Sequence, residues 1–160
     1  MADTFAQWNH RWFGYWQDDL LRESDFPSIS SFVNDSVTLG EDDLNKLYAY
    51  LCGGKVILLN YDVAKCMFPD CEHKMLDVNG AWLTMAPTTD GIWIWPRDLY
   101  HYVRYHSVRI PDNMYHHIRL RNFELPHALK LYDSVLRSLD WPFVPPPVQR
   151  RLDHVQPNDI

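Results

Sequence analysis

The chain has 160 residues, of which 46% are hydrophobic, 22% charged and 14% aromatic. This length suits a single domain with one core, which needs neither disulfides nor metal to bury most of its surface. The net charge of −6 argues against a nucleic-acid-binding surface that depends on phosphate contacts, and the lack of about 18 consecutive apolar residues argues against a membrane span.

Helical periodicity dominates the N-terminal third of the chain. Large apolar residues recur at three- and four-residue steps over residues 5–20 and predict an amphipathic helix: Phe5, Trp8, Trp12, Trp16 and Leu20. The same reasoning predicts a helix over 42–52, which Gly53 and Gly54 end in the left-handed conformation that glycine tolerates.

Three short strands are expected next. The nearly continuous apolar run over 55–61 is typical of a strand buried on both faces. Residues 81–86 and 91–95 form two further strands, joined by a turn that contains the hairpin signal Asp90-Gly91. Trp93 or Trp95 is expected in the core.

The C-terminal part predicts helices over 97–106, 111–118 and 125–139. Four prolines between Pro142 and Pro147 exclude a helix or a central strand, so we expect a proline-rich tail over 142–160. The predicted fold is therefore α+β: a small antiparallel sheet packed with four to five helices in a single domain, residues 1–141.

The N-terminus lacks the basic start and apolar run of a secretory signal. The three cysteines are an odd number and too few for a disulfide framework, which suits a reducing compartment. We expect a cytoplasmic protein.

A metal-like cluster comprises Cys66, Cys71 and His73, with Cys52 nearby in sequence. Thiolates and imidazole are zinc ligands, but there is no paired C-x-x-C knuckle, and free cysteines are commonly buried as small hydrophobes. We therefore expect no metal and no cofactor. His101 and His106 are five residues apart, which places them on different faces of a helix.

Acidic residues are concentrated in the N-terminal part, where residues 1–96 contain 14 acidic and 6 basic side chains. A helix cap needs only a few of these acids, so we interpret the excess as a docking surface for a basic protein. The candidate residues are Asp18, Asp19, Glu41, Asp42 and Asp43. Arg97, Tyr100 and His101 are added as surface candidates, because aromatic and arginine side chains are enriched at interface hot spots.

The runs TDGIWIWPRDLYHYV and VRIPDNMYHHI, within residues 88–118, resemble a pattern of small bacterial immunity-type proteins of polymorphic or contact-dependent toxin systems. The resemblance implies a non-catalytic protein that binds and blocks a toxin, and it assigns no residue roles. A small hydrolase or transferase, with a His/Asp/Cys site assembled from distant residues, is the main alternative. A structural or regulatory subunit of a larger assembly is the third.

Overall fold

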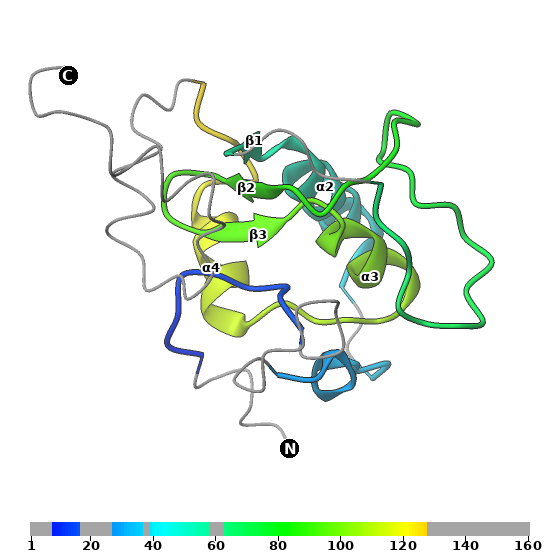
Figure 1. The fold of residues 1–160 in the computed structure, drawn as a ribbon. Helices are drawn as coiled ribbons and strands as arrows, with labels where there is room; N and C mark the ends of the chain where they lie inside the picture. The colour runs from blue at the N-terminus through cyan, green and yellow to red at the C-terminus, as the bar shows by residue number, and fades with distance from the viewer. Residues whose placement is uncertain (1–7, 17–26, 37–38, 58–62, 128–160) are drawn as a thin grey trace, which may run out of the picture.

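The computed structural model describes residues 8–16, 27–36, 39–57 and 63–127 (Figure 1). In chain order these form η1 (Ile29–Phe32), α2 (Glu41–Gly53), β1 (Lys55–Val56), β2 (Pro87–Thr89), β3 (Ile94–Pro96), α3 (Leu99–Tyr105) and α4 (Asp112–Leu120). The strands form one antiparallel sheet in the order β1-β2-β3. The arrangement is a small α+β fold, and none of the described helices is long and apolar enough to cross a lipid bilayer.

The expected four to five helices are not found. The described part of the chain has three α-helices and one short 3-10 helix. α2, α3 and α4 confirm the helices predicted over 42–52, 97–106 and 111–118. The helix predicted over 125–139 and the proline-rich tail fall largely or wholly outside the described residues, as does the expected domain boundary at residue 141.

The helix predicted over 5–20 is wrong for its described residues, 8–16, which contain no helix. Phe13 N donates to the carbonyl of Ile94 at 3.0 Å, so this segment runs beside β3 instead. Every residue over 12–16 is buried. An amphipathic helix leaves one side in water, whereas this aromatic segment is covered on all sides.

The predicted three-stranded sheet is present, but its strands are shorter and shifted. β1 holds Lys55 and Val56 of the predicted strand over 55–61, of which residues 58–61 lie outside the described residues, and β2 begins only after the predicted strand over 81–86 has ended. Thr88 and Thr89 are fully buried. The Thr88 hydroxyl donates to the carbonyl of Trp95 in β3 at 2.8 Å, and the Thr89 hydroxyl donates to the carbonyl of Trp93, just before β3, at 2.7 Å. These threonines are buried because their hydroxyls find partners inside the protein.

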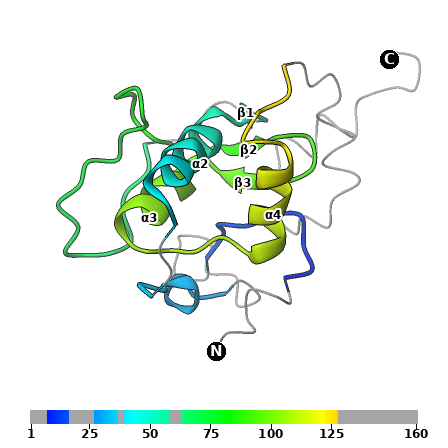
Figure 2. The same cartoon turned by 180° about the vertical axis from the view of Figure 1, so that it is seen from behind.

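The core lies between the sheet and α2, which crosses in front of the strands in Figure 2. Trp93 and Trp95 are both fully buried, as expected for the core. Trp95 stacks on Tyr50 and donates from Nε1 to the carbonyl of Leu51 at 2.9 Å. A Cβ on Gly54 would lie 2.5 Å from the Trp95 ring, so close packing requires this glycine. Its φ of −56° corrects the expected left-handed conformation.

Residues 63–86 form a long connection between β1 and β2, here called the arm, which extends to the right in Figure 1. Two isolated antiparallel bridges, Val63 with Thr84 and Leu76 with Trp82, provide its regular backbone pairing. The carboxylate of Asp77 fastens its tip by accepting from two backbone N–H groups of the turn and from Arg97 at 2.9 Å.

A second buried carboxylate, that of Asp90, joins three segments of the fold. It accepts a hydrogen bond from Tyr50 of α2 at 2.5 Å and another from His117 Nε2 of α4 at 2.8 Å. The backbone N–H groups of Ile92 and Trp93 donate to its other oxygen at 2.9 and 2.7 Å. Burial, and then the nearby Asp90 charge, raise the pKa of Tyr50, so its hydroxyl remains a donor.

We predict that Asp90→Asn destabilises the protein by about 2–4 kcal/mol, because the amide group presents a donor where a buried donor already points. Urea unfolding measures the change. Asp112→Asn is the matched control, since Asp112 lies half-exposed in a surface pair with Arg109 and should cost less than about 1 kcal/mol. Equal unfolding midpoints for the two variants would contradict the role of Asp90.

Candidate metal centre

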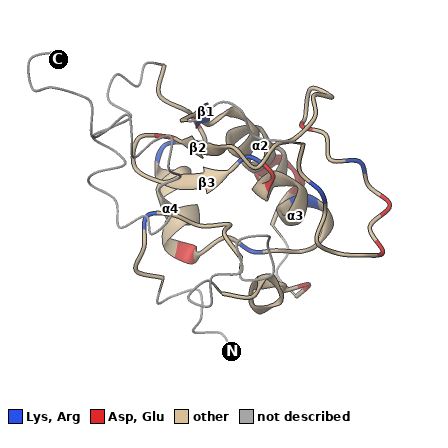
Figure 3. Ribbon diagram, in the orientation of Figure 1, with Lys and Arg blue, Asp and Glu red and all other residues tan. Residues whose placement is uncertain are grey.

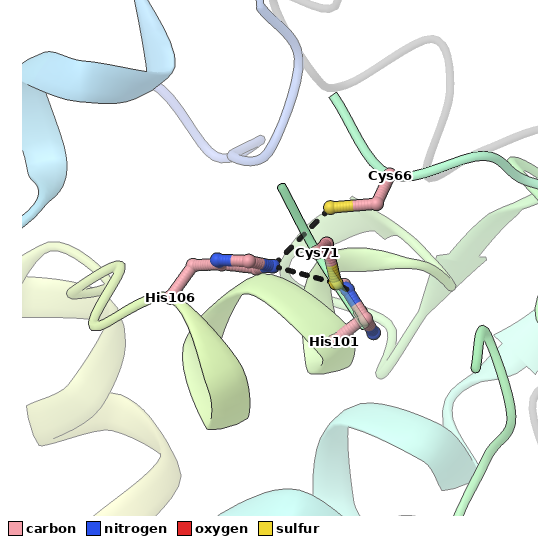
Figure 4. Close-up of side chains that lie close together, drawn as sticks. All are labelled: Cys66, Cys71, His101 and His106. Atoms are coloured by element: carbon pink, nitrogen blue, oxygen red, sulfur yellow. Dashed lines mark hydrogen bonds between the residues drawn. The ribbon is translucent and has the colours of Figure 1, made fainter. Parts of the chain in front are cut away.

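Four side chains that can bind a metal converge where the arm meets α3. Cys66 and Cys71 come from the arm, His101 from α3, and His106 from the residue that caps α3. Their ligand atoms all lie within 4.8 Å of one another (Figure 4). In that view the two sulfurs and the two rings point toward one common centre.

The distances match a tetrahedral site. His106 Nε2 lies 3.2 Å from Cys66 Sγ and 3.3 Å from Cys71 Sγ, and His101 Nε2 lies 3.4 Å from Cys71 Sγ. In a tetrahedral zinc site with Zn–S of about 2.3 Å and Zn–N of about 2.0–2.1 Å, sulfur and nitrogen ligands lie about 3.5 Å apart. These three sulfur–nitrogen pairs are therefore already close to the spacing of zinc ligands, and the remaining pairs lie within 4.8 Å.

The end of α3 brings the two histidines together. Five residues in a continuing helix rotate a side chain well away from its starting face, which is why the sequence placed His101 and His106 on different faces. α3 ends at Tyr105, however, and His106 has a φ of −125° and a ψ of 17°. The change in backbone direction lets the His106 ring swing back to the side of His101.

The arm is held in place by a tyrosine of the same helix. The Tyr102 hydroxyl accepts from the backbone N–H of Met67 at 3.1 Å and donates to the carbonyl of Lys65 at 3.3 Å. These two bonds flank Cys66 and fix its backbone. A tight turn follows, closed by Cys71 N donating to the carbonyl of Phe68 at 3.2 Å, and it returns the second sulfur to the cluster.

Neighbouring groups orient the ligands and exclude water. The Phe68 ring stacks on His106 with centroids 4.2 Å apart and an interplanar angle of 11°. The backbone N–H of Phe68 points at Cys66 Sγ, at 3.4 Å, a contact that favours a thiolate. His101 is fully buried, and its Nδ1 has no hydrogen-bond partner among the described residues, so this ligand lacks the usual outer-shell acceptor.

Burial controls the protonation of the cluster. It raises the pKa of Cys66 to about 11 and lowers the pKa of His101 to about 4, with the nearby His106 and His73 adding to the second shift. The pKa of His106 is also lowered, chiefly by burial. Near neutral pH the two imidazoles are therefore uncharged, which is the form that coordinates a metal.

Hydrogen bonds alone satisfy this cluster poorly. A neutral imidazole nitrogen either accepts one hydrogen bond or donates one, yet His106 Nε2 contacts both sulfurs. A divalent cation at the centre would contact all four ligand atoms, and two thiolates would neutralise its charge. The residue types and their arrangement therefore fit a zinc ion.

The sequence did contain a signal for this site. The order C-x4-C followed by H-x4-H, over Cys66, Cys71, His101 and His106, resembles the ligand spacing of structural zinc sites. A C-x-x-C pattern does not match this wider spacing of the two cysteines. His73, the expected third member, lies outside the four-residue cluster and stacks on Tyr105 instead.

The expected partner-binding residues are scattered, and none lies in the cluster except His101. Tyr100 and His101 are buried, so their expected surface position is wrong. Arg97 is paired with the buried Asp77. Glu41, Asp42 and Asp43 form the first turn of α2, whereas Asp18 and Asp19 lie outside the described residues. Acidic and basic segments both occur along the arm, at the right of Figure 3.

Comparisons of the chain with protein-family models, with curated proteins and with solved structures found no match. The resemblance to immunity-type proteins therefore stays a prediction.

We predict that Tyr102→Phe lowers stability by about 1–2 kcal/mol and speeds hydrogen exchange at the Met67 amide, because both hydrogen bonds to the arm are lost. Tyr105→Phe is the control, since it keeps the ring that stacks on His73. Native-state exchange followed by mass spectrometry gives the measurement. Unchanged protection of the 65–68 segment would show that Tyr102 does not hold the arm.

Proposed function

We propose that the protein binds one zinc ion through Cys66, Cys71, His101 and His106, and that the ion is structural. The observation that carries this proposal is the convergence of two sulfurs and two imidazole nitrogens within 4.8 Å. Tetrahedral sites of two sulfurs and two nitrogens are typical of zinc. Four protein ligands complete the coordination sphere and leave no position for a substrate.

The ion would fasten the arm to α3. Over its 24 residues the arm has only two isolated bridges, and its few buried apolar residues include Ala64, Met75 and Leu83. A zinc ion bound by two arm residues, by His101 of α3 and by His106 just after it would add the constraint that this long connection otherwise lacks. Two metal-binding thiols also suit a reducing compartment, so we place the protein in the cytoplasm.

The alternative of a hydrolase or transferase is less well supported. Cysteine, histidine and aspartate side chains meet at two places in the described residues. One is the four-ligand cluster, and the other is the pair of Asp90 and His117. No serine, threonine or cysteine contacts His117 in the described part of the chain, so the pair lacks the nucleophile that a His–Asp base would activate.

We predict that the protein purified without added metal contains close to one zinc per chain, as measured by elemental analysis. Cys66→Ser and His101→Asn should each reduce the zinc content by more than half and lower the melting temperature. Cys52→Ala and His73→Asn are the controls, because both residues lie outside the cluster. These variants should keep the metal.

Cobalt(II) provides a second readout of the same site. The reconstituted protein should show the visible absorption of a tetrahedral thiolate complex, and Cys71→Ser should change that spectrum. Chelation should increase proteolysis of the arm before the sheet unfolds. A metal-free protein that neither takes up cobalt nor changes on chelation would refute the proposal.

A second candidate function is recognition of a basic protein, as the immunity-type resemblance implies. Glu41 and Asp42 support it: both are exposed, and neither has a hydrogen-bond or ion-pair partner among the described residues. Part of the acidic excess has another cause, since Asp77 and Asp90 are buried and bind internal donors. Asp77 and Asp90 therefore do not belong to the proposed docking surface, whose described residues are Glu41, Asp42 and Asp43.

We predict that neutralising Glu41, Asp42 and Asp43 together slows association with a basic partner several-fold and flattens its salt dependence, leaving dissociation nearly unchanged. The partner to test is the C-terminal domain of a large secreted protein encoded beside this gene. Neutralising Asp70 and Glu72 of the arm is the matched control. An unchanged on-rate would mean that the three acids only complement the dipole of α2.

A further inference from the structure

A cavity of about 370 Å³ lies on the other side of α3 from the arm, between the start of α2, the end of α3 and residues 107–112. Its volume falls within the range of small-molecule sites. It shares no residue with the cluster of Cys66, Cys71, His101 and His106, so an inference about it does not rest on the zinc proposal.

The wall of the cavity is mainly aliphatic. Side chains of α2 and the residues just before it, of α3 and of the segment after α3 supply it: Leu39, Leu44, Leu47, Val103, Val108 and Ile110. Leu47, Val108 and Ile110 are buried members of the core, which makes this wall a fixed part of the fold. Transfer of a ligand's apolar part from water onto this preformed surface would therefore be favourable.

One cation in the lining has no carboxylate partner. The guanidinium of Arg104 donates to the Tyr100 hydroxyl and lies over the rings of Tyr48, Tyr100 and Tyr105, at 5.1–5.8 Å from their centroids. No acidic side chain of the described residues pairs with it. The other arginine of the lining, Arg109, is already bound to Asp112 at 2.6 Å.

The tyrosines hold Arg104 without neutralising it. Their rings restrict the guanidinium by cation–π contact, and only one of its five N–H donors is used by a described side chain. Tyr48 also lines the cavity, and burial raises its pKa, so its hydroxyl stays protonated as a second donor. Arg104 is exposed and shares the cavity lining with Tyr48, so side chains that carry donors and apolar side chains belong to one lining.

The backbone beside the cavity is strained and firmly held. Ser107, a lining residue, has a φ of 52°, a conformation that costs a non-glycine residue about 1 kcal/mol or more. Its carbonyl accepts from Asn34 N at 2.9 Å, and Arg109 N donates to the carbonyl of Phe32 at 2.8 Å. These bonds keep the wall in place, so the cavity is preorganised.

We propose that this cavity binds a small organic monocarboxylate, with its apolar body between α2 and α3 and its carboxylate on Arg104. The planar guanidinium matches a carboxylate with two parallel hydrogen bonds. A phosphate fits less well, because Asp35 and Asp112 also line the cavity and would repel a second negative charge. Arg104 is the one cation of the described lining without a carboxylate partner, so the ligand's expected charge is minus one.

The test compares 4-phenylbutyrate with 4-phenyl-1-butanol, which has the same body but no charge, on the full-length metal-loaded protein. Calorimetry gives the affinity, and amide NMR shifts locate the site. We expect the acid to bind about tenfold or more tightly than the alcohol, with shifts in residues 103–110. Monocarboxylates with bodies of six to twelve carbons extend the series.

Two variants separate charge from shape. Arg104→Met should weaken the acid about tenfold and leave the alcohol unchanged, whereas Lys74→Met removes a charge outside the cavity and should change neither. Leu44→Phe narrows the cavity and should weaken both ligands. Thermal melting checks that each variant is folded.

The proposal is overturned by any of three results. These are no binding by any acid of the series at millimolar concentration, equal affinities for acid and alcohol, or an unchanged acid affinity in Arg104→Met. Binding only of peptides that end in a hydrophobic residue with a free carboxylate, and not of the small acids, would also overturn it in favour of chain-end recognition.

Discussion

The carboxylate of Asp90 is buried among donors from three parts of the chain, and the positions of α2, α4 and the β2–β3 turn depend on it. A buried charge is costly unless it is fully hydrogen-bonded. Tyr50, His117 and two backbone N–H groups of the turn supply those bonds, while Arg121 of the turn after α4 donates to the Asp90 carbonyl. Satisfying this one side chain therefore requires two helices and the hairpin to assemble together.

The cluster of Cys66, Cys71, His101 and His106 beside α3 has the opposite electrostatic character to Asp90. Asp90 is a negative group that recruits donors, whereas the two sulfurs and two imidazoles are electron-pair donors that lack a common acceptor. Both places join segments that are distant in sequence. The first joins helices that already flank the sheet, and the second joins the arm, whose own secondary structure is slight.

Periodicity predicted α2 and α4 because each buries one side, as Met114 and Ile118 do in α4, whereas α3 buries four consecutive residues and was indicated by the proline and acid before it. It failed over residues 8–16, where large aromatic residues at helical spacing fill an extended segment beside β3. It also failed at Thr88 and Thr89, since a buried hydroxyl with an internal partner is indistinguishable in sequence from a turn residue. Short-range patterns do not reveal tertiary partners.

The same limit explains the candidate site. Two cysteines close in sequence were visible, but their histidine partners lie 30, 35 and 40 residues away in the three pairs that the structure brings together. The prediction that His101 and His106 lie on different faces holds only for a helix that continues past Tyr105, where α3 in fact ends. The end of a helix is the feature that sequence locates least securely, and here one residue at that end decides whether the four ligand atoms converge.

The turn after α3 belongs to both proposed sites. His106 points toward the arm, and the next residue, Ser107, lies in the opposite wall with its left-handed backbone fixed by Asn34. A left-handed residue has little freedom to adjust, so displacement of His106 must be transmitted to Ser107. If metal occupancy changes the shape of the cavity, thermodynamic linkage requires the cavity's ligand to change metal affinity by the same factor. The strained turn would then couple the two sites, so that the affinity of each site would depend on whether the other is occupied.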